Sequence, residues 1–168
     1  MKSDGLGETP EAITAFVSHA RGFRALVETC DAQSEREFLL DVSRHLAALY
    51  SLGIQLQGKG GLEPPEPPAE GDWSWAMGRL EPFLSRTDEY RKIQATYPES
   101  AEQDATIEGC LANDLSTIYR YAALFNESAA DQAKMDAAAQ FTREVGEQVV
   151  DALKAIYSAE YDDFLFKR

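Results

Sequence analysis

The chain has 168 residues, a formal net charge of −13 at pH 7 and only two cysteines. This length suits one domain with a core large enough to need no disulfide or metal for folding. The excess of acidic side chains repels phosphate backbones and anionic lipids, so it disfavours binding to nucleic acid or to a membrane surface.

The first predicted helix runs from Thr9 to about Thr29, after residues 1–8, which are expected to form a flexible terminus. Thr9 can cap this helix, and Pro10 is favoured at a first helical position. Arg24 falls inside its apolar stripe, although a charged side chain belongs on the opposite face. The stripe consists of Ile13, Phe16, Val17, Ala20, Phe23 and Val27.

The second predicted helix covers about 35–56 and opens with Ser34 and Glu37 at the spacing of a capping box. Residues 57–71 follow, and their many prolines and glycines predict a long loop without helix or strand. The helices on both sides of this loop need each other to bury their apolar faces. We therefore expect the loop to lie within one domain.

Helical spacing returns from Asp72, a possible cap, to about Leu84, where Pro82 should kink or end the helix. Residues 87–98 are expected to form at most a short turn of helix. No segment shows the alternation of polar and apolar residues that is typical of a strand.

The next predicted helix extends over 100–126, and Asp114 lies in the middle of its apolar stripe. At 100° per residue, Asp114 points within about 20° of Ile107, Ile118 and Phe125. A carboxylate at this position is a catalytic acid, a metal ligand or a satisfied buried charge.

The last and longest predicted helix spans about 128–159. Gly146 within it allows either the close approach of a neighbouring helix or a bend, and a packed bundle favours the close approach. Residues 160–168 are expected to be a tail too short to form an element of its own.

Together these elements predict an all-α fold, an up-and-down bundle of about five helices with one long Pro/Gly-rich loop. Residues 1–168 are expected to form a single domain.

Two motifs make the chain resemble an uncharacterised bacterial family of helical proteins, domain of unknown function 5063. The first motif is an acid-Leu-x-x-Ile-Tyr signature, and the second is Gly-x-x-(Leu/Val)-Val-x-Ala-Leu. The resemblance covers about residues 10–160, implies a helical fold and brings no activity with it. The residues that carry it are Asp114, Leu115, Ile118 and Tyr119, and then Gly146, Val149, Val150, Ala152 and Leu153.

Arg24 is the obvious cation to meet Asp114, because each residue is the charged exception in its own stripe. A buried carboxylate is costly unless it is paired, and a guanidinium can donate to both of its oxygens. We therefore predict a structural buried pair of Arg24 and Asp114. One alternative is a functional pocket around Asp114 that also uses Arg24, Tyr50, Tyr119 and Tyr121, and the other is a mistaken helical phase.

Established catalytic patterns are missing from the sequence. The two histidines, His19 and His45, are not preceded by Glu at the three-residue spacing of helical di-metal sites. Cys110 has no evident base, and no nucleophile elbow or phosphate loop is present. We expect no catalytic, metal or cofactor-binding residues.

The charge pattern points to a protein partner, because residues 99–136 hold eight acidic side chains and two basic ones. Glu102, Asp104 and Glu108 are candidate contacts. Trp73 and Trp75 cannot both face the core because they are spaced by two, so one of them either anchors an interface or folds back over the Pro/Gly-rich loop. The acidic residues form either a solvated face or a docking surface for a basic partner. They are Glu99, Glu102, Asp104, Glu108, Asp114, Glu127, Asp131 and Asp136.

These observations favour a non-catalytic acidic interaction protein, such as an adaptor, a regulator or an immunity-type partner. The alternatives are a small-ligand-binding or enzymatic bundle and, third, a nucleic-acid mimic. Two cysteines far apart in the chain are typical of free thiols in a reducing compartment. Without an apolar leader or a membrane span in the sequence, we expect a cytoplasmic protein.

Overall fold

A computed structural model describes residues 8–58, 68–84, 89–93 and 106–166, with the backbone alone for 8–9, 89–93, 106–108 and 160–166. This part of the chain contains five α-helices, one short 3-10 helix and one pair of strands. They are α1 (Glu8–Glu28), η1 (Cys30–Ala32), α2 (Glu35–Leu56), α3 (Glu70–Phe83), β1 (Glu89–Ile93), β2 (Thr106–Cys110), α4 (Leu111–Ala122) and α5 (Asp131–Phe166). The predicted all-α bundle of about five helices is confirmed.

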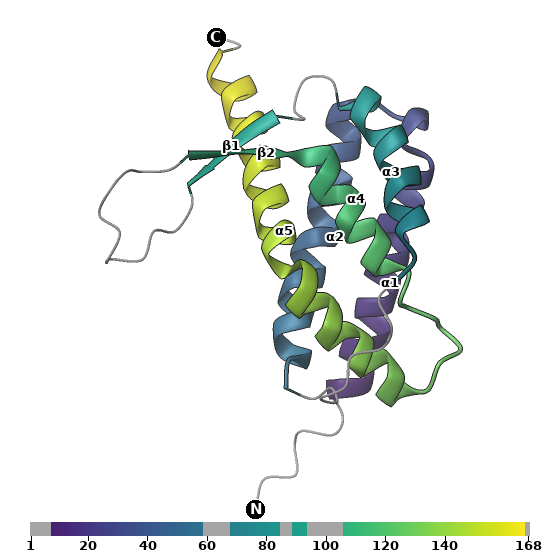
Figure 1. Ribbon diagram of the computed structural model, residues 1–168. Coiled ribbons are helices and arrows are strands. Elements are labelled where there is room, and N and C mark those ends of the chain that lie inside the picture. The colour runs from purple at the N-terminus through teal and green to yellow at the C-terminus, as the bar shows by residue number, and fades with distance from the viewer. Residues whose placement is uncertain (1–7, 59–67, 85–88, 94–105, 167–168) are drawn as a thin grey trace, which may run out of the picture.

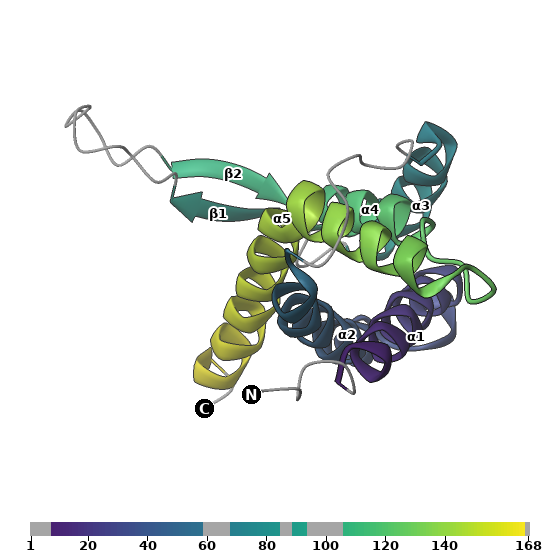
Figure 2. The same cartoon turned by 90° about the horizontal axis from the view of Figure 1, so that it is seen from below.

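The helices run in alternating directions along the chain (Figure 1). α2 packs between α1 and α5, while α4 packs between α3 and α5. Seen from below in Figure 2, the helices surround a common interior. Each helix therefore buries one stripe, as the sequence periodicity predicted.

Three phenylalanines contact one another between α1, α5 and the segment that follows α4. The ring centroid of Phe16 lies 4.9 Å from that of Phe125 and 5.5 Å from that of Phe141. All three rings are buried. Aromatic rings at these separations and tilted angles attract each other beyond the gain from burial, so this cluster ties α1 to α5.

The predicted capping box starts α2. Ser34 Oγ accepts from the Glu37 backbone N–H at 3.3 Å, and the Glu37 carboxylate accepts from the Ser34 backbone N–H at 3.1 Å. These bonds satisfy backbone donors that have no partner within the helix. The helix therefore begins where the sequence predicted.

The prediction that the chain contains no strand is wrong. β1 and β2 pair antiparallel, with Glu89 opposite Cys110 and Ile93 opposite Thr106, and the hairpin projects away from the helices (Figures 1 and 2). As a result α4 begins at Leu111, and Ile107 belongs to a strand. Pairing between two separate segments depends on how they align in space, which the periodicity of one segment does not reveal.

Other predicted boundaries shift as well. α5 continues to Phe166, so most of the predicted tail 160–168 extends this helix. α3 begins at Glu70, inside the predicted loop 57–71, and contains Pro82 in its last turn. Residues 59–67 of that loop, and residues 1–7 of the predicted flexible terminus, lie outside the described residues.

Gly146 does not lie at a helix contact, because nothing beyond the adjacent backbone of α5 lies within 4 Å of the place where its Cβ would be. The favoured prediction of a close approach there is wrong. α5 does change direction along its length in both views (Figures 1 and 2).

Candidate functional site

Arg24 is the centre of a polar cluster between α1, α3 and α4, which we call the Arg24 cluster (Arg24, Glu28, Asp72 and Tyr119). The guanidinium donates from Nη2 to Tyr119 Oη at 3.1 Å, and that hydroxyl donates to Glu28 Oε1 at 3.0 Å. Arg24 also forms longer ion pairs, from Nε to Glu28 at 3.8 Å and from Nη1 to Asp72 at 3.6 Å. Two carboxylates and a phenol thus share one partly buried cation.

The Tyr119 hydroxyl stays protonated in this cluster. Its burial, and then its hydrogen bond to Glu28, raise the pKa of Tyr119, while Arg24 acts in the opposite direction. A neutral phenol can accept from Arg24 and donate to Glu28 at the same time. Tyr119 therefore links the two charged side chains of α1 to α4.

Trp75 extends the cluster to the surface. Its indole stacks on the Tyr119 ring, with centroids 5.4 Å apart and planes inclined by 27°. The Arg79 guanidinium lies 5.2 Å from the centre of the Trp75 ring and is itself held by Asp31 at 2.8 Å. Trp75 is nevertheless 45% exposed, so this aromatic ring is both accessible and fixed in place.

The spacing argument for the two tryptophans agrees with their burial, because Trp73 is partly buried and Trp75 is exposed. Of the other candidate contacts, Glu102 and Asp104 lie outside the described residues. Glu108 belongs to β2, where the structure describes its backbone alone.

Asp114 is buried as its place in the stripe predicted, with 6% of its surface exposed. The structure does not bring it to Arg24, whose ion pairs go to Glu28 and Asp72. Tyr119, the residue of α4 that Arg24 contacts, lies five positions after Asp114, which is about 7.5 Å along the axis and about 140° around it. Asp114 makes its interaction with another group.

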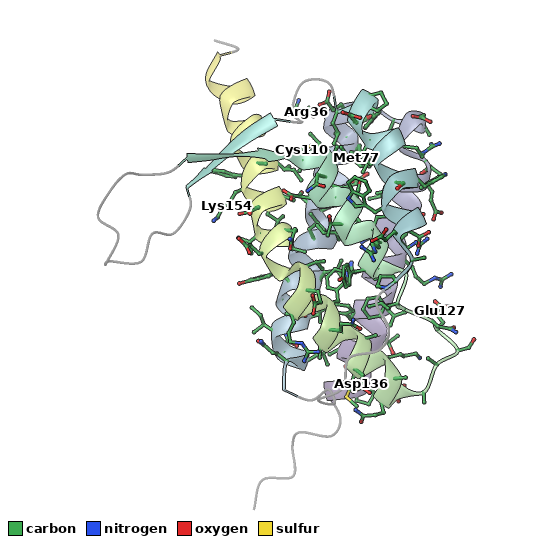
Figure 3. The ribbon with its side chains drawn as sticks, in the orientation of Figure 1. Arg36, Met77, Cys110, Glu127, Asp136 and Lys154 are labelled. Carbon is green, nitrogen blue, oxygen red and sulfur yellow. The ribbon has the colours of Figure 1, made fainter. Side chains whose placement is uncertain are left out.

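The buried position of Asp114 also removes it from the acidic surface proposed for residues 99–136. Glu127 remains exposed on the connection between α4 and α5 (Figure 3), where it forms an ion pair with Arg21. Asp131 lies 3.9 Å from Lys134. The described carboxylates of this segment are therefore partly neutralised by neighbouring basic side chains.

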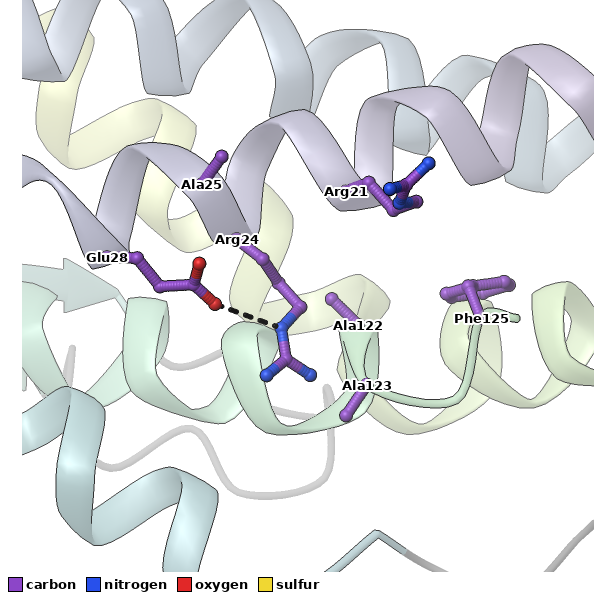
Figure 4. Close-up of a pocket in the computed structure, with 7 residues that line it drawn as sticks. All are labelled: Arg21, Arg24, Ala25, Glu28, Ala122, Ala123 and Phe125. Carbon is purple, nitrogen blue, oxygen red and sulfur yellow. Dashed lines mark ion pairs between the residues drawn. The ribbon is translucent and has the colours of Figure 1, made fainter. Parts of the chain in front are cut away.

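A pocket of about 310 Å³ opens between α1 and the end of α4 (Figure 4). Asp114 does not line this cavity, so the cavity is not the functional pocket predicted around Asp114. The guanidinium of Arg24 reaches from α1 towards Ala122 and Ala123 in Figure 4. The lining residues are Arg21, Arg24, Ala25, Glu28, Ala122, Ala123 and Phe125.

Burial shifts the pKa values of two groups elsewhere in the bundle. Burial, and then His19, lower the pKa of His45, while Asp41 acts in the opposite direction. Burial, and then Asp31, raise the pKa of the Cys30 thiol, which makes it a poor nucleophile. No group of three or more metal-ligating side chains gathers within the described parts of the chain.

Sequence reasoning missed the partners of Arg24 and Trp75, although part of the signal was present. Glu28 follows Arg24 by four residues, and Arg79 follows Trp75 by four, which is the spacing of neighbours on a helix surface. The contact of these pairs with each other through Tyr119 depends on how three helices pack, so no local pattern could have found it.

The family model of DUF5063, a domain of unknown function, matches residues 8–162. The chain belongs to this family. The two motifs that suggested DUF5063 lie on α4 and α5, which pack against each other. Three residues of the first motif, Leu115, Ile118 and Tyr119, are buried in the core, so this motif supports the packing of the bundle.

A crystal structure of protein BF1032 from Bacteroides fragilis, a structural genomics target, is similar to the DUF5063 chain described above. The TM-score is 0.65 at 21% sequence identity, over 89% of this chain and 92% of that chain. At this identity the likeness shows the fold alone. No curated protein matches the chain, and none of the described helices is long and apolar enough to span a membrane.

Proposed function

We propose that this chain is a non-catalytic interaction protein that binds a basic protein partner through the surface around Trp75. The observation that carries the proposal is the state of this side chain, which is 45% exposed and stacked on Tyr119. Tryptophan is enriched among the residues that contribute most to protein interfaces. An indole that is already fixed loses little conformational entropy on binding.

The charge of the whole chain, and not the charges next to Trp75, supports a basic partner. Near Trp75 the carboxylates of Asp72 and Asp31 are already paired with Arg24 and Arg79. The chain as a whole carries a net charge of −13. A partner rich in Lys and Arg would therefore meet a complementary potential, which raises the rate of association.

The same proposal places the protein in the cytoplasm. Neither Cys30 nor Cys110 forms a disulfide, as is usual for proteins in a reducing compartment.

The test is affinity purification from lysate of the source cells with the full chain and two variants. Trp75→Ala removes the proposed anchor. Tyr157→Ala, on α5, is the matched control because it removes an aromatic side chain that is 70% exposed. A basic protein should be recovered with the wild type and with Tyr157→Ala, and Trp75→Ala should weaken its affinity at least about tenfold.

Added salt should weaken the same complex, because screening shortens the reach of surface charges. Equal recovery with Trp75→Ala, in a variant that unfolds at the wild-type temperature, would contradict the proposed anchor. Recovery of an acidic partner would contradict the proposed charge complementarity.

A second candidate function is the binding of a small ligand in the pocket between α1 and α4. The observation that favours it is the combination of Phe125 and three alanines with the charged groups of Arg21, Arg24 and Glu28. Mixed linings of this kind are usual in small-molecule sites. A metabolite that raises the unfolding temperature of the wild type, but not of Ala25→Leu, would identify such a ligand.

A further inference from the structure

His19 on α1 and His45 on α2 turn the same ring nitrogen towards each other across the contact between these helices. The two Nδ1 atoms lie 3.1 Å apart, and the ring planes are inclined by 67°. Both imidazoles are partly buried. Two nitrogens this close either share one proton in a hydrogen bond or act as the two arms of a chelate.

The backbone of α1 sets the position of the His45 ring. A Cβ at Gly22 would lie 2.4 Å from His45 Cε1 and 3.0 Å from its Nδ1. The imidazole thus occupies a notch that any other residue at position 22 would fill. Because Gly22 follows His19 by three residues on the same helix, the notch brings the two Nδ1 atoms together.

The spacing of the two nitrogens fits a metal ion. Zinc holds imidazole nitrogens at about 2.0–2.1 Å in a tetrahedral arrangement, which places two of them about 3.3 Å apart. Imidazole suits zinc, copper and nickel rather than magnesium or calcium. The net charge of −13 attracts a cation, while Asp41, one turn before His45, is already paired with Arg44 at 2.7 Å.

We infer that His19 and His45 form a two-nitrogen site for a borderline divalent transition-metal ion of the zinc class, which joins α1 to α2. The described residues supply no third ligand to this site, so water completes the coordination of the proposed ion. This inference is independent of the proposed docking surface at Trp75, because the two sites share no residue.

The test is calorimetric titration of the metal-free full chain with zinc chloride and, separately, magnesium chloride. We expect one zinc ion per chain, no binding of magnesium, and a higher unfolding temperature with zinc. His19→Gln and His45→Gln should each weaken zinc binding at least tenfold and abolish the thermal shift. Cys110→Ser is the control for binding at a thiol and should bind zinc like the wild type.

NMR gives a readout that does not depend on stability. The chain has only two histidines, so zinc should shift the Nδ1 resonances of both. The imidazole that carries the shared Nδ1 proton in the metal-free pair should also change to the Nε2–H tautomer, which shifts its Nε2 resonance. Zinc binding that survives in both histidine variants, or that is lost in Cys110→Ser, would overturn the inference. Absence of saturable zinc binding by the wild type would overturn it as well.

Discussion

Of the glycines in α2 and α5, Gly53 lies at the tightest contact between these two helices. A Cβ at this position would lie 2.4 Å from Thr142 Oγ1. That hydroxyl donates to the carbonyl of Ala138 at 2.9 Å, and Gly53 is buried. The close approach that the sequence suggested for Gly146 of α5 is thus provided by a glycine of α2.

Gly53→Ala should therefore lower the free energy of unfolding by about 1–2 kcal/mol, because overpacking at a helix contact outweighs the better helix propensity of alanine. In a Thr142→Ala background the hydroxyl is gone, and the same change should be neutral or stabilising. Urea unfolding of the four proteins measures both effects. An equal loss in both backgrounds would show that Thr142 is not the obstacle.

Tyr119 is the residue through which α4 contacts the charged side chains of α1. Tyr119→Phe keeps the ring under Trp75 but removes the hydroxyl that accepts from Arg24 and donates to Glu28. We expect a loss of about 1–3 kcal/mol, since hydrogen bonds to charged groups are involved. Tyr50→Phe, at a site that is 41% exposed, is the control and should change stability by less than about 0.5 kcal/mol in urea unfolding.

At the scale of single elements, the start of α2 depends on its capping box. Ser34→Ala removes the oxygen that accepts from the Glu37 backbone N–H and should cost about 1 kcal/mol at neutral pH. Ser51→Ala, at an exposed position on the same helix, should cost nothing measurable. Chemical unfolding of both variants gives the comparison.

The cost of Ser34→Ala should also depend on pH. The hydrogen bonds from Ser34 lower the pKa of Glu37 below its ordinary value of 4.5. A carboxylate with a lowered folded-state pKa contributes stability above its unfolded-state pKa and loses it as the pH falls. The difference between wild type and variant should therefore shrink below about pH 4.5, and a difference that grows on acidification would contradict this role of Glu37.

At the scale of the whole molecule, the net charge of −13 acts against the compact state through self-repulsion. Raising the salt concentration from about 0.01 M to 0.15 M shortens the Debye length from about 30 Å to about 8 Å. We expect the unfolding temperature to rise over this range, as followed by circular dichroism. A fall would mean that the surface ion pairs, such as Asp31 with Arg79, contribute more than the repulsion costs.

The sequence by itself determined the all-α class, the start and extent of α2, the buried position of Asp114 and the exposure of one tryptophan. These features depend on local rules, because helical periodicity, capping and charge operate within a few residues. Only the tertiary structure decided that Arg24 meets Tyr119 instead of Asp114, that His19 faces His45, and that β1 pairs with β2. Such contacts depend on how helices rotate and strands align in space, and no single segment of the chain encodes that geometry.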